Sequence, residues 1–158
     1  MLPKPSKLAS QLSAENAAWA ALLGTLADEE RALIDGDADR LAALNATKLE
    51  RLHAASELAR ARMAALADAG FPPSHSGMEN WLARHGNAAA RADWHSLRTL
   101  EDQARASNLR IGKLIEMRMS ATRQALNVLM HAATGKGGLY DPSGQAVAAH
   151  ASKPLTAA

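Results

Sequence analysis

The chain has 158 residues, 18 of them basic and 16 acidic, no cysteine, and only 3% aromatic side chains. The length suits one domain, or one domain with tails, and the lack of cysteine excludes disulfides, thiolate catalysis and cysteine metal sites. Basic and acidic side chains interleave along the chain instead of gathering on one face, which argues against a nucleic-acid-binding surface.

The hydrophobic share of 47% consists largely of alanine, which favours helix but buries little area, so we expect a helical body with a thin core. Met1–Lys7 is followed by no continuous apolar stretch of the kind that a secretory signal needs. The longest uncharged and mostly apolar run, Ala17–Ala27, is shorter than the about 20 residues that cross a bilayer. We therefore expect a soluble, cytoplasmic protein that does not insert into a membrane.

The first predicted helix extends from about residue 6 to residue 34. Glu15 and Glu30 lie about four turns apart along this helix, which is too far apart for a catalytic pair. We expect each glutamate to lie at the edge of the seam, the apolar face along which the helix packs, or to pair with a basic side chain. Gly36 is predicted to end the helix and Asp37 to cap the next one. At about 100° per residue, the apolar side chains fall within an arc of about 120°; they are Leu8, Leu12, Trp19, Leu22, Leu23, Leu26, Leu33 and Ile34.

A second long amphipathic helix follows and is predicted to close at Ala69–Gly70. The prolines within residues 71–75 prevent a continuous helix there. Ser76 and Glu79, three residues apart, have the form of a capping box, which predicts a short helix that ends at Gly86. The apolar positions of the second helix are Leu41, Leu44, Leu49, Leu52, Met63 and Leu66.

The last predicted helix is the longest, from about Ala88 to Ala133, and it contains no proline. Beyond it the sequence turns to Gly, Ser, Pro, Ala and His, which cannot bury enough apolar surface to fix a structure. We therefore predict a helical domain, residues 1–134, and a flexible C-terminal tail, residues 135–158. The fold class is all-α: an elongated antiparallel helical bundle or coiled coil of three long helices and one short helix.

The second half of the last helix carries more apolar surface than one packing partner requires. Around Ile111 the apolar arc spans about 200° or more, with methionines on both flanks. Two interpretations are open: neighbouring helices or a dimer partner cover this surface, or it is an adaptable surface for a partner helix, to which flexible methionines are suited. The candidate binding residues are Leu114, Ile115, Met117, Met119, Leu126, Val128, Leu129 and Met130.

Leu139 and Tyr140 stand out within the predicted tail, because a leucine and the only tyrosine follow one another in a segment otherwise unable to fold. Exposed aliphatic and aromatic pairs in flexible tails are typical of short docking motifs. The alternative, in which Tyr140 packs back onto the helices, is equally compatible with the composition.

The sequence predicts a binding protein without an active site, a cofactor or a metal site. None of the six histidines forms a His-x-x-x-His or Glu-x-x-His pair, so we expect no metal ligands among them. Residues 134–137 resemble a phosphate-binding loop only superficially. The leading glycine and the Ser or Thr after Lys136 are missing, and no strand precedes the segment.

Two ordered groups of residues near the C-terminus carry a family resemblance. The first comprises Asn108, Gly112, residues 114–116 and residues 123–129, and the second comprises Leu139, Tyr140, Gly144 and Gln145. Their order and spacing resemble the closing helix and the Leu-Tyr-Gly tail of the FlgN family of flagellar type III export chaperones. The preceding helices match only in length and pattern. Ile111 and Asp141 depart from residues that relatives can carry, and the chain is mildly basic where such chaperones are often acidic.

The resemblance implies a cytoplasmic chaperone that binds the hook–filament junction proteins, also called hook-associated proteins, and delivers them to the export apparatus. It implies that the closing helix binds the secreted protein. It also implies that Leu139, Tyr140, Gly144 and Gln145 form a tail motif that docks on the cytoplasmic domain of the export gate FlhA. A homodimer is compatible with this reading, and a self-associating coiled-coil scaffold is the alternative, because long helices with heptad-like seams also favour self-association.

Overall fold

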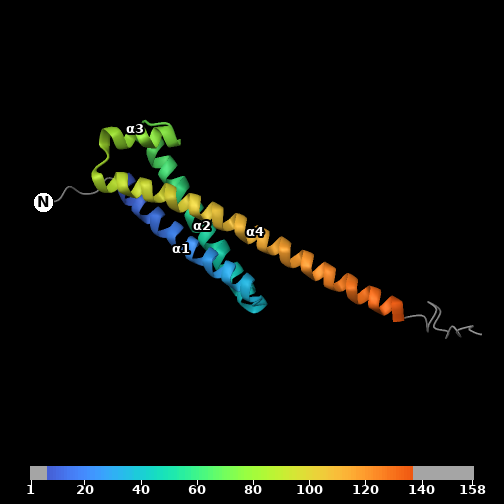
Figure 1. The fold of residues 1–158 in the computed structure, drawn as a ribbon. Coiled ribbons are helices and arrows are strands. Elements are labelled where there is room, and N and C mark those ends of the chain that lie inside the picture. Colours follow the sequence, from blue (N-terminus) through green and yellow to red (C-terminus); the bar gives the residue numbers. More distant parts are fainter. Residues whose placement is uncertain (1–6, 137–158) are drawn as a thin grey trace, which may run out of the picture. The chain divides into compact units, whose positions relative to one another are not determined.

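The computed structural model describes residues 7–136, which form four α-helices (Figure 1). They are α1 (Lys7–Asp35), α2 (Ala38–Asp68), α3 (His75–His85) and α4 (Ala88–Lys136). The predicted all-α fold of three long helices and one short helix, packed antiparallel, is confirmed. None of these helices combines the length and the apolarity that a bilayer crossing requires.

The chain divides into two compact units, with the boundary between Ile115 and Glu116. We call residues 7–115 the helical body and residues 116–136 the distal segment of α4. The helix α4 continues to Lys136, three residues beyond its predicted end at Ala133. The predicted tail, with Leu139, Tyr140, Gly144 and Gln145, lies outside the described residues.

The turn between α1 and α2 forms as the sequence predicts. Gly36 follows the last residue of α1 with a φ of 73°, a conformation that glycine adopts without steric cost. The Asp37 side chain accepts a hydrogen bond from the backbone N–H of Arg40 at 2.9 Å and so caps α2. A two-residue connection therefore reverses the chain and sets α2 against α1.

The start of α3 differs from the predicted capping box. The helix begins at His75, and the hydroxyl of Ser74 accepts the backbone N–H of Gly77 at 3.1 Å. Glu79 accepts a hydrogen bond from the indole of Trp94. Ser76 therefore lies inside the helix, and the capping-box prediction was wrong. The physical reason is that Ser74 is the first residue after the two prolines that combines an extended backbone with a side-chain oxygen.

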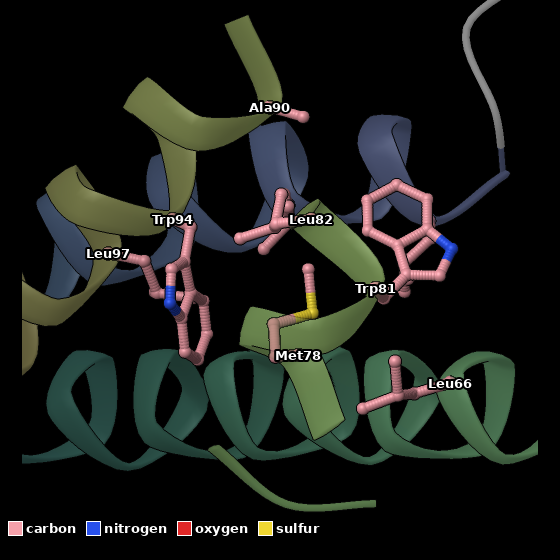
Figure 2. Close-up of a cluster of buried hydrophobic side chains, with 9 residues drawn as sticks. Leu66, Met78, Trp81, Leu82, Ala90, Trp94 and Leu97 are labelled. Atoms are coloured by element: carbon pink, nitrogen blue, oxygen red, sulfur yellow. The ribbon is translucent and has the colours of Figure 1, made fainter. Parts of the chain in front are cut away.

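The core of the helical body consists of two clusters of buried side chains. The first lies where α3 packs between the long helices (Figure 2) and comprises Leu8, Leu12, Leu66, Met78, Trp81, Leu82, Ala90, Trp94 and Leu97. The second is smaller and joins α1 to the middle of α4 through Leu22, Leu26, Leu33, Ala104 and Ile111. The prediction of a thin core is therefore confirmed most clearly for the second cluster, to which α2 adds no buried residue.

Three residues of the predicted apolar stripes are exposed: Ile34 at the end of α1, and Leu49 and Leu52 in α2. Only part of the predicted apolar stripe along α2 is therefore buried in the core. Periodicity identifies the apolar side of a helix, but burial also needs a neighbouring element to cover that side.

A buried ion pair crosses the core between α1 and α2. Glu15 is 0% and Arg62 is 3% exposed, and Arg62 donates two hydrogen bonds to the carboxylate, at 2.7 and 3.3 Å. The Arg62 guanidinium also lies 5.1 Å from the centroid of the Trp94 ring. Glu30 pairs with Arg110 at 3.2 Å nearer the surface. Both glutamates of the first apolar arc therefore pair with arginines, as the sequence suggested.

Candidate partner-binding surface

The distal segment of α4 exposes its apolar side chains. Every side chain from Glu116 to Gly135 is exposed, and Met117, at 68%, is among the most exposed. Of the eleven large apolar side chains that are exposed among the described residues, seven lie between Ile115 and Met130. Such a concentration on one helix typically marks an interaction surface.

The distal segment is helical because its sequence suits a helix. Residues 116–136 contain no proline and are rich in alanine, methionine, leucine and arginine, which are strong helix formers. The hydroxyl of Thr122 donates to the carbonyl of Arg118 at 2.9 Å, and that of Thr134 donates to the carbonyl of Met130 at 2.9 Å. These hydroxyls are thus satisfied by the helix itself, and the apolar side chains remain on its surface.

The body ends where the exposed surface begins. Ile111 is buried in the second cluster and Leu114 is partly buried against it. Ile115 is the first of the candidate residues to be exposed. Leu114 is therefore available to a partner only in part, while the other seven candidate residues are exposed: Ile115, Met117, Met119, Leu126, Val128, Leu129 and Met130.

The charge of the distal segment is opposite in sign to that of the body. Residues 116–136 contain two arginines, one lysine and one glutamate, whereas residues 7–115 contain 13 basic and 14 acidic residues. Among residues 7–136, no group of three or more His, Asp or Glu side chains is placed to hold a metal ion. The distal segment thus offers apolar contact area and a few polar side chains, the chemistry of helix–helix association.

The helical body has a second apolar surface that the sequence patterns did not predict, a groove that we call the lateral groove. It has a volume of about 480 Å³. Its position could not be read from any single helix, because all three long helices contribute to it. The lining residues are Trp19, Leu22 and Leu26 from α1, Lys48 and Leu52 from α2, and Glu101, Ala104, Arg105 and Asn108 from α4.

The carboxyl group of Glu101 lies at the wall of this groove in an unfavourable place for charge. Burial raises the pKa of Glu101 above its ordinary value of 4.5, and the nearby guanidinium of Arg98, at 3.3 Å, offsets that rise only in part. The groove therefore has an apolar floor and one carboxyl group, that of Glu101, whose ionised form is disfavoured by burial.

The chain matches a model of a known protein family. The family model described as FlgN protein matches residues 1–148, a span that covers all four helices and extends past Gln145. None of the curated proteins and none of the solved structures compared with the chain matches it.

Proposed function

Since the chain belongs to the FlgN family, whose members are non-enzymatic flagellar export chaperones for hook-associated proteins, we propose that the distal segment of α4 binds the secreted protein. The observation that carries this proposal is the run of exposed apolar side chains from Met117 to Met130. The body already has its own core in the two buried clusters, so the distal side chains are not needed to hold it together.

In the proposed mechanism, an amphipathic segment of the hook-associated protein lays its apolar face against Leu126, Val128 and Met130. The contact is helix-in-groove or coiled-coil packing. Each apolar side chain that becomes fully buried contributes about 1.5–3 kcal/mol, and ordering a flexible cargo segment offsets several of those contacts. The result is an affinity high enough to hide aggregation-prone surface and low enough to allow release.

Three methionines suit this surface to more than one cargo. Met117, Met119 and Met130 are all exposed, and the unbranched, polarisable methionine side chain adapts to differently shaped partners. The family handles hook-associated proteins as a class, so an adaptable surface fits its task better than a rigid pocket.

We assign the second task, delivery, to the C-terminal residues. In this proposal the residues that follow α4 form a docking tail separate from the helical domain, and Leu139, Tyr140, Gly144 and Gln145 contact the cytoplasmic domain of the export gate FlhA. The support is the resemblance of these residues to the family tail and the reach of the family match to residue 148. A tethered second contact raises the local concentration of loaded chaperone at the gate. The family is cytoplasmic, and we place this chain in the cytoplasm with it.

Co-purification with a hook-associated protein tests both assignments. We expect Leu126→Asp and Val128→Asp to lose the cargo, because each puts a carboxylate into the apolar contact. Leu49→Asp is the matched control, since Leu49 is an exposed leucine outside the distal segment and its replacement leaves the cargo bound. Tyr140→Ala is expected to keep the cargo and to lose binding to the FlhA domain. Full cargo retention by both distal variants would contradict the proposed site.

A further inference from the structure

The distal segment of α4 carries an apolar seam at the spacing of a coiled coil. Its positions follow one another at alternating intervals of three and four residues, which keeps them on one side of the helix and suits lengthwise packing against another helix. All of these side chains are exposed. We call this set the distal seam, and it comprises Met119, Thr122, Leu126, Leu129 and Ala133.

The threonine in the distal seam acts as an apolar position. The hydroxyl of Thr122 donates to the backbone carbonyl of Arg118 at 2.9 Å, so its donor is already used and its methyl group is left for packing. The other four side chains of the seam are apolar. A partner helix that covers the seam therefore needs an unbroken apolar stripe of about 21 Å, the length of residues 119–133.

Arginines flank the distal seam on both sides. At about 100° per residue, Arg118 lies about 60° to one side of the centre of the seam and Arg123 about 80° to the other side. Both side chains are exposed. Glu116 lies farther round the helix on the Arg123 side, at about 100° from the centre of the seam. In coiled coils, the charges at such flanking positions set which partner helix is accepted.

We propose that the cargo segment is an acidic amphipathic helix, whose apolar stripe packs on the distal seam and whose carboxylates, on both edges of that stripe, pair with Arg118 and Arg123. This inference rests on the proposed function and adds the charge of the cargo to it. Residues 116–136 contain three basic residues and one acidic residue, a net charge of +2. An acidic helix complements this charge, whereas a basic helix brings like charges together at both edges of the seam.

The apolar seam supplies affinity and the two arginines supply selectivity. An exposed ion pair is weak beside the burial of an apolar side chain, so charge alone does not hold the cargo. Between two helices with the same apolar stripe, however, attraction at both arginines is exchanged for repulsion. Two such exchanges together should separate an acidic helix from a basic one by about tenfold in affinity.

Two synthetic peptides of three heptads each test the charge of the partner. Both carry leucine at every a and d position, and they differ only at the flanking e and g positions, which are glutamate in one peptide and lysine in the other. Fluorescence anisotropy of the labelled peptides measures their affinity for the full chain. We expect the wild type to bind the glutamate peptide about tenfold more tightly, and this preference should shrink at high salt, which screens exposed charges.

Charge reversal at the two arginines is the matching change in the protein. The double variant Arg118→Glu/Arg123→Glu should prefer the lysine peptide, because both edges of the seam are then acidic. The control Arg31→Glu/Arg60→Glu changes the net charge equally, at two exposed arginines of the helical body, and should keep the preference of the wild type for the glutamate peptide. A reversed preference cannot come from misfolding, which would weaken the binding of both peptides.

The outcomes separate the charge of the cargo from the location of its site. Equal binding of the two peptides by the wild type, binding of neither, or a preference for the glutamate peptide that survives in Arg118→Glu/Arg123→Glu would each overturn the acidic partner. Leu126→Asp tests the site itself and should lose both peptides, because it places a carboxylate in the seam. Equal peptide binding that Leu126→Asp abolishes would refute the acidic cargo and leave the proposed site intact. Tight binding of the glutamate peptide by Leu126→Asp would refute the site.

Discussion

Removing one partner of the buried Glu15–Arg62 pair is expected to destabilise the body severely. The Glu15 carboxylate is fully buried and accepts both of its arginine hydrogen bonds from Arg62. Breaking such a pair from one side costs about 3–5 kcal/mol, because the remaining charge stays buried without a partner. We therefore expect Arg62→Met to lower the free energy of unfolding by about 3–5 kcal/mol, out of the roughly 5–15 kcal/mol typical of a domain.

The double variant Glu15→Met/Arg62→Met is the informative control. Apolar side chains of similar size in place of both charges usually leave stability unchanged or raise it. The double variant also loses the cation–π contact between the Arg62 guanidinium and the Trp94 ring, whose centroid lies 5.1 Å away. This loss lowers the stability by about 0.5–2 kcal/mol. We expect the double variant to lie within about 2 kcal/mol of wild type.

Urea denaturation followed by far-ultraviolet circular dichroism measures all four proteins of this cycle. The two single substitutions are expected to be strongly non-additive, since each removes the same pair. The reasoning is refuted if Arg62→Met costs less than about 1 kcal/mol, within the range of an exposed ion pair, or if the double variant loses as much as the two single variants together.

Two further predictions concern caps and pH. Ser74→Ala should lower the free energy of unfolding by about 1 kcal/mol, because it removes the N-cap of α3. Ser76→Ala should lower it less. If urea denaturation showed the larger loss for Ser76→Ala, Ser76 would be the cap, as the capping-box prediction had it. Burial raises the pKa of Glu101, so the folded state binds the proton of this carboxyl group more tightly than the unfolded state does. This proton binding stabilises the folded state below pH 4.5, and the stabilisation is lost as the pH rises through the raised pKa. Glu101→Gln should therefore be more stable than wild type at pH 7 and should lose that advantage below pH 4.5; an advantage that persists there would contradict the assignment.

Periodicity and helix punctuation predicted most of the secondary structure. Gly36 and Asp37 separate α1 from α2, and Gly86 ends α3, because these residues act through the backbone of their immediate neighbours. The start of α3 was also predicted wrongly for a local reason. Ser74 and Ser76 can both cap a helix, and the cap in the structure is Ser74, the residue that directly follows the two prolines.

Burial was harder to predict, because it depends on residues far away in the sequence. The sequence left open whether the apolar arc of α4 is core or binding surface, and the structure divides it: Ile111 is buried, Leu114 is partly buried, and Leu126 is exposed. The lateral groove depends on three helices together, so no pattern within one helix could reveal it.

Methionine oxidation tests the central claim, that cargo covers the distal segment of α4, most directly. Met117, Met119 and Met130 are exposed, whereas Met78 is fully buried and serves as an internal control. Exposed methionines are oxidised to the sulfoxide by mild peroxide, and mass spectrometry reports each site separately. The account predicts that bound hook-associated protein slows oxidation of the three distal methionines and leaves Met78 unreactive throughout. Equal oxidation rates at Met117, Met119 and Met130 with and without saturating cargo would contradict it.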